Sequence, residues 1–363
     1  MSEEWLKVLG SSVSEWNKNV ADQFAKMGKA PSLGEINTQI EMSSSEVVHT
    51  VGRVKLIHYK PLMKKVLPVP LLIVYALINR YYILDLQPDR SVVRDYLEQG
   101  IDVYVIDWGD PLPSDRYETI GDEVDYIDVM VDVIRKKSKV SRVNLHGYCM
   151  GGTFCTIYSA LHREKVNSLV AQAAPVDFSS NAGILTVWSR HVDADKIVDT
   201  FGNVPAEFMN VGFLLVNPIM LLLDKYVNFY ENAADKGFVE NFLKMERWIF
   251  DSPDVPGESY RQFLNDLYKQ NLLVKGKLVV GEDVVKLKQV VAPLLVITAD
   301  NDNLVTPDMS RPLVGLVSSR EKKMLSFAGG HIGLSVSPRA HREFWPKVTR
   351  WVAEHSSKKG SRP

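Results

Sequence analysis

The sequence predicts an α/β fold with a mostly parallel sheet, helices on both of its faces and a mainly helical cap inserted between two strands. Short apolar runs rich in Val, Ile and Leu recur from residue 51 onward, and amphipathic helical patterns separate several of them. The alternation stops after residue 176 and resumes near residue 290. Near-continuous apolar strands separated by helices are typical of a parallel sheet that is covered on both faces.

The expected elements of the core follow in order along the chain. Strands are predicted at residues 55–59, 71–77, 103–108, 143–145, 168–172, 294–298 and 324–327. Helices are predicted at residues 89–99, 121–137 and 151–162, where apolar residues recur at three- and four-residue spacing. The core is therefore assigned to residues 51–176 and 290–363.

Residues 177–289 form the predicted cap. Their clearest patterns are helical, near residues 214–225, 231–250 and 259–271. A compact domain rarely contains an irregular loop longer than about 15 residues. We therefore expect this stretch to be an inserted helical subdomain.

Residues 1–50 are predicted to be a separate N-terminal helical segment. One helix face is apolar, with Trp5, Leu9, Val13, Trp16, Val20, Phe24 and Met27. Gly28 and Pro31 end the pattern. The helix either packs on its own domain or docks on a partner or an apolar surface.

Composition and charge exclude several classes of protein. Lys and Arg total 43 and Asp and Glu total 44, a balance that argues against a protein that coats a polyanion. Two cysteines without a CxxC pair exclude a disulfide framework and a Cys-rich zinc module, and no pair of histidines has metal-ligand spacing. We see no secretory signal and no apolar run long enough to span a bilayer, so a cytoplasmic protein without a metal is expected.

The most informative stretch is Gly147-Tyr148-Cys149-Met150-Gly151, between an apolar strand and a helix. It is the G-x-S-x-G elbow of the α/β-hydrolase fold, with cysteine in place of serine. The two glycines allow the tight turn, which exposes the nucleophile at the start of the helix. Cys149 is therefore the predicted nucleophile, and the alternative is a glycine-rich turn with an inert thiol. Cys155 is expected to be a small core residue.

The acid and the base follow the nucleophile in this fold. Asp300 and Asp302 both come just after the strand at 294–298, where the acid belongs. Asp302 is favoured because it lies further into the loop, whereas Asp300 can cap the turn. His331 follows the last strand and two glycines, which is the expected setting of the base.

Two backbone amides are expected to bind the oxyanion of the reaction. Met150 supplies one of them, because it begins the helix after the elbow. The other comes from the loop after the strand at 71–77, where Ala76 and Leu77 both remain candidates. His146 adjoins the elbow and is either a supporting residue of the site or a satisfied core histidine.

Together, several motifs resemble those of the polyhydroxyalkanoate synthases. They are Tyr75-Ala-Leu-Ile-Asn79-Arg-Tyr-Tyr-Ile-Leu-Asp85-Leu, Asp102-Val-Tyr-Val-Ile-Asp107-Trp108-Gly, Gly147-Tyr-Cys-Met-Gly-Gly152, Asp199-Thr-Phe-Gly-Asn203-Val-Pro and Gly329-Gly-His331-Ile-Gly. The short chain and the run Trp248-Ile-Phe-Asp-Ser-Pro resemble the catalytic chain of class III, while the elbow also resembles class IV. The resemblance covers roughly residues 50–355.

The resemblance implies a function and a set of residues. Its catalytic cysteine, aspartate and histidine fall on Cys149, Asp302 and His331. It implies polymerisation of (R)-3-hydroxyacyl-CoA, most often 3-hydroxybutyryl-CoA, into polyhydroxyalkanoate through an acyl-cysteine, with release of CoA. No cofactor is implied, because CoA is part of the substrate and a product.

The resemblance also implies partners. These are a small second synthase subunit, a further copy of the chain and the surface of a cytoplasmic polymer granule, with no nucleic acid and no membrane span. One departure is that the family usually has Asp-His in the acid loop, where this chain has Asp302-Asn303. The alternatives are a cysteine-dependent esterase or thioesterase and a non-catalytic granule protein.

Overall fold

The computed structural model describes residues 37, 39–40, 42–180, 183–216 and 224–357. The predicted N-terminal helix over residues 5–27 lies outside them. The chain divides into two compact units. The sheet unit takes residues 41–210 and 251–363, and the helical unit takes residues 1–40 and 211–250.

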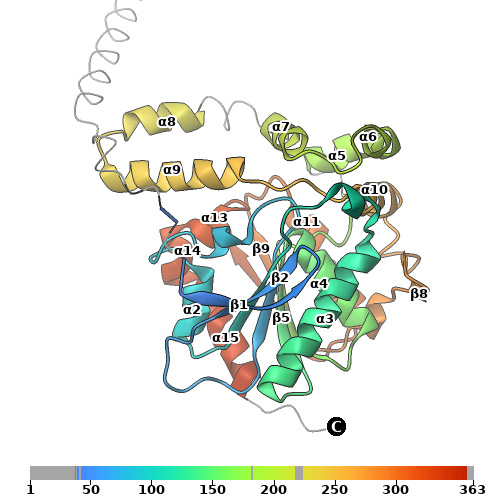
Figure 1. The fold of residues 1–363 in the computed structure, drawn as a ribbon, viewed down its shortest axis with the longest axis horizontal. Helices are drawn as coiled ribbons and strands as arrows, with labels where there is room; N and C mark the ends of the chain where they lie inside the picture. The colour runs from blue at the N-terminus through green and yellow to red at the C-terminus, as the bar shows by residue number, and fades with distance from the viewer. Residues whose placement is uncertain (1–36, 38, 41, 181–182, 217–223, 358–363) are drawn as a thin grey trace, which may run out of the picture. The chain divides into compact units, whose positions relative to one another are not determined.

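The sheet unit is built on eight strands in the order β1-β2-β4-β3-β5-β6-β9-β10 (Figure 1). From β4 to β10 neighbouring strands are parallel, whereas β1 and β2 add an antiparallel edge. The strands are β1 (Ser45–Val51), β2 (Val54–Tyr59), β3 (Leu71–Val74), β4 (Val103–Asp107), β5 (Val143–Tyr148), β6 (Val166–Gln172), β9 (Leu294–Ala299) and β10 (Lys322–Phe327). The predicted fold class is confirmed, as are the seven predicted strands.

The sheet begins earlier than the sequence indicated. β1 pairs with β2 from Ser45 opposite Tyr59 to Val51 opposite Val54, so residues 45–50 belong to the core and not to the N-terminal segment. The expected boundary at residue 51 is wrong for a physical reason. Because β1 lies at the edge of the sheet, much of it is exposed and it lacks the apolar run by which the other strands were recognised.

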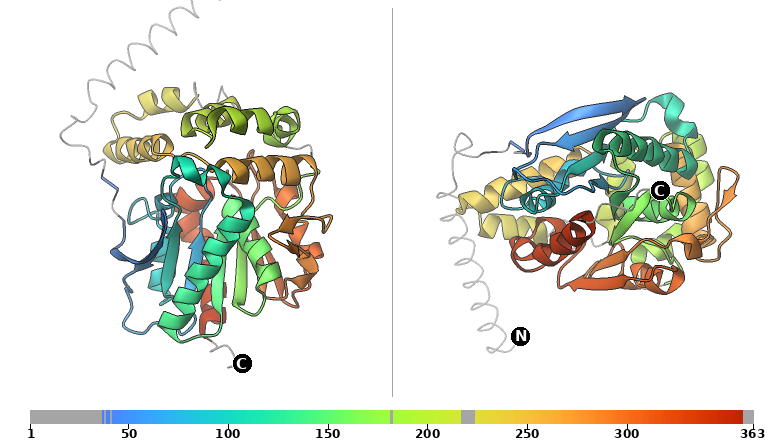
Figure 2. Two further views of the ribbon diagram at one scale, coloured as in Figure 1. Left: turned by 45° about the vertical axis from the view of Figure 1, so that its right-hand side comes forward. Right: turned by 90° about the horizontal axis from the view of Figure 1, so that it is seen from below.

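Helices cover both faces of the sheet. Figure 2 shows it between α3 and α4 on one side and α2 and α15 on the other. The helices of the core are α2 (Val92–Glu98), α3 (Ile120–Ser138), α4 (Met150–Leu161), α11 (Pro307–Ser310), α12 (Leu313–Leu316), α13 (Gly333–Val336), α14 (Pro338–Glu343) and α15 (Trp345–Ser357), with short 3-10 turns at Tyr81–Leu84, Pro113–Tyr117 and Leu287–Gln289. The three helices expected in the core are confirmed.

The start of α3 illustrates how the sequence sets a helix end. The Thr119 side chain accepts a hydrogen bond from the Asp122 amide, and the Asp122 side chain accepts one from the Thr119 amide. This capping box satisfies two backbone donors that the first turn leaves free. Acidic residues in the first turn and basic residues in the last turn also match the helix dipole.

The insertion between β6 and β9 is mainly helical. Its elements are α5 (Ile184–His191), α6 (Ala194–Phe201), α7 (Ala206–Val216), α8 (Lys225–Glu231), α9 (Lys236–Phe250), α10 (Gly257–Gln262), a π-helical turn at Phe263–Lys269 and a small hairpin of β7 (Val279–Val280) and β8 (Asp283–Val284). Residues 211–250 fall in the helical unit, and the rest of the insertion belongs to the sheet unit. The hairpin was not expected, since strands of two residues carry no periodicity.

Within the helical unit, α8 and α9 are held together by aromatic and charged contacts. The ring of Phe242 lies 4.4 Å from that of Phe229 and 5.9 Å from that of Tyr226. Lys225 pairs with Glu246, which also accepts a hydrogen bond from the Tyr226 hydroxyl at 3.0 Å. An aromatic stripe and an ion pair thus join the two helices.

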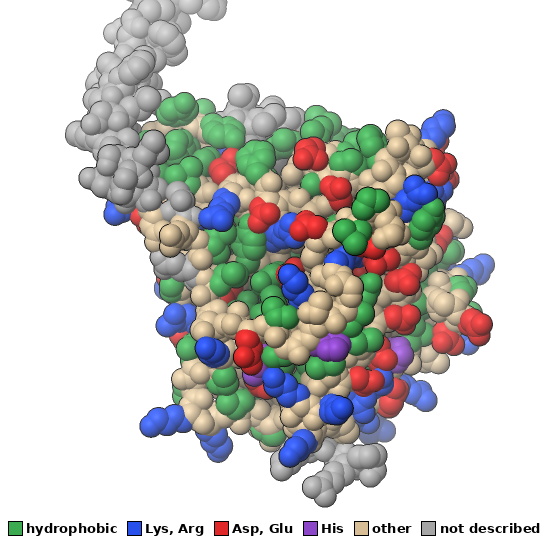
Figure 3. All heavy atoms as spheres, viewed as in Figure 1, with side chains coloured by type: hydrophobic (Ala, Val, Ile, Leu, Met, Phe, Trp, Pro, Cys, Tyr) green, Lys and Arg blue, Asp and Glu red, His purple; other side chains and the backbone are tan. Residues whose placement is uncertain are grey.

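Charged side chains of both signs are interspersed over the face of the molecule in Figure 3, in keeping with the net charge of −1. No helix in the described ranges combines the length and the apolarity that crossing a bilayer requires.

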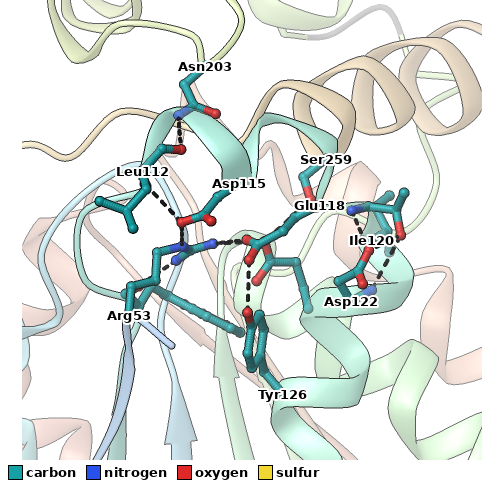
Figure 4. Close-up of polar contacts among 12 residues, drawn as sticks. Arg53, Leu112, Asp115, Glu118, Ile120, Asp122, Tyr126, Asn203 and Ser259 are labelled. Carbon is teal, nitrogen blue, oxygen red and sulfur yellow. Dashed lines mark hydrogen bonds and ion pairs between the residues drawn. The ribbon is translucent and has the colours of Figure 1, made fainter. Parts of the chain in front are cut away.

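A group of charged side chains around Arg53 is buried, unlike the charges on the surface. Arg53 is only 6% exposed and forms ion pairs with Asp115 and Glu118 (Figure 4). It also lies 3.6 Å from the buried Glu123. A buried cation with several carboxylates fixes the surrounding loops, because separating them would leave uncompensated charges.

Candidate active site

Cys149 stands at the turn between β5 and α4, in a strained backbone conformation. Its φ and ψ are 54° and −125°, a region that residues with a side chain rarely adopt. Such strain persists only where the surroundings enforce it, and it gathers at functional sites. Here the enforcement comes from α4, where every residue from Met150 to Ala160 is buried.

The two glycines of the elbow are required by close backbone contacts. A Cβ on Gly147 would lie 2.4 Å from the carbonyl oxygen of Gly151, and one on Gly151 would lie 2.1 Å from that of Val74. No side chain fits at these distances. The expected tight packing of strand and helix around the cysteine is therefore present.

The two cysteines have different environments. Cys149 is partly exposed and lies close enough to His331 for its charge to contribute to raising the pKa of that imidazole. Cys155 is fully buried within α4, and burial raises the pKa of its thiol. Since the thiolate is the reactive form, Cys155 is the less reactive of the two.

His331 and Asp302 come together from two loops that follow β10 and β9. The His331 Nδ1 lies 2.6 Å from the Asp302 Oδ2, and the Asp302 side chain is fully buried. The other oxygen of Asp302 accepts hydrogen bonds from the amides of Leu304 and Val305, at 2.9 and 2.8 Å. The carboxylate is thus fixed on one side by the loop and orients the imidazole on the other.

The charges around His331 favour its protonated form. Burial acts to lower its pKa, but Asp302 and Cys149 together outweigh burial and raise it. His331 is thus hydrogen-bonded to Asp302 and lies next to Cys149. The structure brings together the three side chains that the sequence indicated.

Asp300, the competing candidate for the acid, faces elsewhere. Its carboxylate accepts a hydrogen bond from the Ser326 hydroxyl and lies 3.9 Å from Arg311. Its side chain is 47% exposed. Asp300 thus ties the end of β9 to the neighbouring strand β10, and Asp302 is the carboxylate that contacts the histidine.

The candidate oxyanion residues lie beside the elbow. Met150 is the first residue of α4 and is buried. Val74, at the end of β3, pairs with Gly147, so the loop with Ala76 and Leu77 begins next to the nucleophile. Both loop residues are buried, at 4% and 2% exposure, and the oxyanion roles of Met150 and Ala76 stay predictions.

Three tyrosines of the site were missed by sequence reasoning. The Tyr148 hydroxyl donates to the carbonyl oxygen of His331 at 2.7 Å, and its ring also contacts Tyr75. Tyr268 lies in the π-helical turn, close enough to Cys149 and Asp302 for their charges to add to burial in raising its pKa. Tyr148 adjoins the nucleophile in the elbow and could have been suspected, whereas nothing in the sequence signals Tyr268.

His146 is a satisfied core histidine. Its Nδ1 lies 3.1 Å from the Tyr96 hydroxyl, and its Nε2 lies 2.8 Å from the side-chain oxygen of Gln172. Burial lowers its pKa to about 4. The Gln172 side chain in turn donates a hydrogen bond to the Ser335 hydroxyl, and its backbone carbonyl accepts one from the Cys149 amide. This network therefore connects His146 to the backbone of the elbow.

The buried His146 predicts a loss of stability in mild acid. The unfolded chain protonates this histidine near pH 6.5 but the folded chain only near pH 4, so the unfolded state binds more protons between these values. The free energy of unfolding should therefore fall as the pH drops through this window, by up to about 3 kcal/mol from this residue. Urea unfolding of the wild type and of His146→Asn at pH 7, 6, 5 and 4 measures the difference in slope.

The control for this experiment is the same substitution at the exposed His191, which should leave the slope unchanged. If the curves of the wild type and His146→Asn stay parallel down to pH 4, the folded protein does not hold His146 neutral and the prediction is wrong.

Comparison with known proteins places the chain among relatives of one kind. A family model of the alpha/beta hydrolase fold matches residues 69–338, and one of the N-terminus of poly-beta-hydroxybutyrate polymerase matches residues 11–96. The chain is 48% identical over 288 residues to the poly(3-hydroxyalkanoate) polymerase subunit PhaC of Allochromatium vinosum, which covers 79% of this chain and 81% of the relative. It is 44% identical over 335 residues to the PhaC subunit of Haloferax mediterranei, and this match covers 92% of this chain and 68% of the relative.

Solved structures add evidence on the fold alone. The monoacylglycerol lipase of Paleococcus ferrophilus superposes with a TM-score of 0.51 at 14% identity, covering 79% of this chain and 96% of the lipase. At this identity the likeness carries no information on substrate or reaction. It supports the α/β-hydrolase fold that the family model also indicates.

Proposed function

Because the chain belongs to the poly(3-hydroxyalkanoate) polymerases, we propose that Cys149, Asp302 and His331 carry out its reaction through a covalent acyl-cysteine. The chain is an enzyme, an acyltransferase that forms polyhydroxyalkanoate. Its proposed substrate is an (R)-3-hydroxyacyl-CoA, with 3-hydroxybutyryl-CoA as the first candidate. The observation that carries the proposal is a strained, partly exposed cysteine beside a buried histidine that is hydrogen-bonded to a buried aspartate.

Acylation begins from the thiolate of Cys149 beside the imidazolium of His331. The thiolate attacks the carbonyl carbon of the CoA thioester, and the charge that develops on oxygen is stabilised by the amides of Met150 and the loop after β3. The bond to the CoA sulfur then breaks, and the leaving thiolate takes the proton of the imidazolium. Asp302 holds the ring in the orientation that this transfer needs.

Elongation uses the neutral imidazole that acylation leaves behind. His331 accepts the proton of a hydroxyl group, from the growing chain or an incoming monomer, and the oxygen attacks the acyl-cysteine. An ester bond forms, the carbon–sulfur bond to Cys149 breaks, and the thiolate is restored beside an imidazolium. The cycle therefore closes without a cofactor, and none is proposed.

A cysteine suits this chemistry better than a serine. Exchange of one thioester for another is nearly neutral in free energy. An acyl-serine would be an ester, which is a more stable intermediate and would raise the barrier to the next acyl transfer. Water must be kept from the acyl-cysteine, since it would release free acid. Phe178, Phe263 and Tyr268 form an aromatic cluster with ring centroids 4.6 to 6.0 Å apart, and Tyr268 brings it close to Cys149.

The proposed partners extend beyond the substrate. We propose a small second synthase subunit, association between copies of the chain and attachment to the surface of cytoplasmic polymer granules, all on the strength of the family resemblance. The apolar face of residues 5–27 is a candidate for the docking of one of these partners. Asn303, where the family usually has histidine, is proposed to take over part of the recognition of CoA.

The test is to incubate the purified chain with (R)-3-hydroxybutyryl-CoA and to follow CoA release and polymer mass together. Release of CoA matched by ester-linked oligomers supports the proposal. Release of CoA with free hydroxybutyrate as the sole product would make the chain a thioesterase. Absence of CoA release, with and without the small subunit, would favour a non-catalytic granule protein.

A further inference from the structure

Trp108 belongs to a motif that the reaction scheme does not use. It follows β4 directly and is 5% exposed. Its indole Nε1 donates a hydrogen bond to the backbone carbonyl oxygen of Tyr75 at 3.0 Å. Tyr75 is the first residue after β3, so Trp108 is bonded to the start of the loop with the candidate oxyanion donors Ala76 and Leu77.

The same loop is pressed against the elbow. A Cβ on Gly151 would lie 2.1 Å from the carbonyl oxygen of Val74 and 2.7 Å from that of Tyr75. The carbonyl of Tyr75 thus lies between the first turn of α4 and the indole of Trp108. A peptide unit is planar, so a hydrogen bond to its oxygen also restricts the direction of the following amide.

Trp108 is itself held in place at its backbone. The Arg53 guanidinium donates a hydrogen bond to the Trp108 carbonyl oxygen. Gly109 has a φ of 66°, and a Cβ there would lie 2.5 Å from the carbonyl oxygen of Arg53. Arg53 is fixed in turn by Asp115 and Glu118, as Figure 4 shows. The buried charges therefore fix the residue that contacts the loop.

We propose that Trp108 is a positioning residue that holds the loop after β3 so that its backbone amide is ready to bind the oxyanion. The proposal rests on the proposed acyl transfer at Cys149. Without the indole hydrogen bond the loop loses its anchor on the side away from the elbow, and the amide spends less time in the productive direction. Removal of one oxyanion donor costs about 100- to 1,000-fold in rate, and a loosened donor is expected to cost less.

The experiment compares two reactions of the same cysteine. Acylation by a simple hydroxyacyl thioester passes through an oxyanion, whereas alkylation by iodoacetamide does not. In Trp108→Phe, acylation of Cys149 should slow by roughly 10- to 100-fold. Alkylation should proceed at the wild-type rate. In steady-state turnover, kcat should fall while KM stays unchanged. Mass spectrometry of the intact protein after short reaction times follows both reactions, whether or not polymer forms.

Two further variants make the result specific. Benzothienylalanine at position 108 replaces only the indole N–H by sulfur, so it should reproduce the effect even if Trp108→Phe folds poorly. Trp351 is a buried tryptophan of the last helix, and its indole donates a hydrogen bond to Glu321 at 2.9 Å. Trp351→Phe removes this donor in the same way and should change neither reaction. Equal losses of acylation and alkylation, or no loss of either, would overturn the proposal. If the wild type forms no polymer but Trp108→Phe still slows acylation and leaves alkylation unchanged, the proposed function fails and the positioning role stands.

Discussion

Replacing Cys149 with alanine is expected to abolish both CoA release and polymer formation. In the proposed reaction the Cys149 sulfur takes the acyl group from CoA, and the other cysteine, Cys155, is buried and is not expected to replace it. Loss of a covalent nucleophile typically lowers turnover by about a millionfold, which is below detection in a CoA-release assay. The measurement is CoA release from hydroxybutyryl-CoA, together with a search for the acyl adduct by mass spectrometry.

Cys155→Ala is the matched control, because it removes the same thiol group close by in the chain, within α4. Cys155 is fully buried, and burial raises the pKa of its thiol, so it takes no part in the exchange. The variant should retain most of the activity and carry the acyl adduct on Cys149. Turnover near the wild-type rate in Cys149→Ala, or an adduct on Cys155 in the wild type, would show that the nucleophile had been assigned wrongly.

The regular alternation of apolar strands and amphipathic helices is the part of the fold that could be predicted from the sequence. Seven strands were recognised because each contains a short apolar or β-branched run. The elbow was recognised from its two glycines, which the close backbone contacts at Gly147 and Gly151 require. β1 was missed because an edge strand needs no continuous apolar sequence. The hairpin of β7 and β8 was missed because its two-residue strands show no pattern at all.

The site shows the same division. Cys149, Asp302 and His331 could be proposed as one site because each follows a strand at the same edge of the sheet. The choice between Asp302 and Asp300 was only a preference in the sequence, and the loop geometry supports it: the Leu304 and Val305 amides turn the Asp302 carboxylate toward His331. Tyr268 could not be found, since its approach to the cysteine depends on how residues 251–289 pack within the sheet unit.

The indole of Trp108 is an intermediate case. The sequence showed it as part of a motif after a strand, but its hydrogen bond crosses from β4 to the end of β3. Parallel pairing of β3 with β4 brings the two strand ends together, so such a contact becomes visible only when the order of strands is known. Residues that support a site through their neighbours are hard to assign from sequence for this reason.

Asp302→Asn is expected to leave Cys149 acylable but to slow polymer growth by roughly 1,000- to 10,000-fold. The carboxylate accepts the Nδ1–H of His331 and supplies negative charge that raises the pKa of the imidazole. The two amides that bond to Oδ1 would hold the amide oxygen of asparagine in its place, so its NH₂ group would face the ring. The ring would then carry its proton on Nε2 and could not accept the proton of the incoming hydroxyl. Acylation can still proceed through the few per cent of a cysteine thiol that is ionised at pH 7 without a base. Single-turnover acylation and steady-state chain growth, measured on the same sample, separate the two steps.

Asp300→Asn tests whether the effect belongs to this carboxylate and not to any charge in the loop. Asp300 is half exposed and bonds to Ser326, so its substitution should be mild in both steps. A severe loss in Asp300→Asn with a mild one in Asp302→Asn would make Asp300 the acid. Equal rates of chain growth in all three proteins would mean that His331 needs no carboxylate to orient it. A melting temperature within a few degrees of the wild type in both variants ties the loss to the imidazole, since a loop that had come apart would lower it.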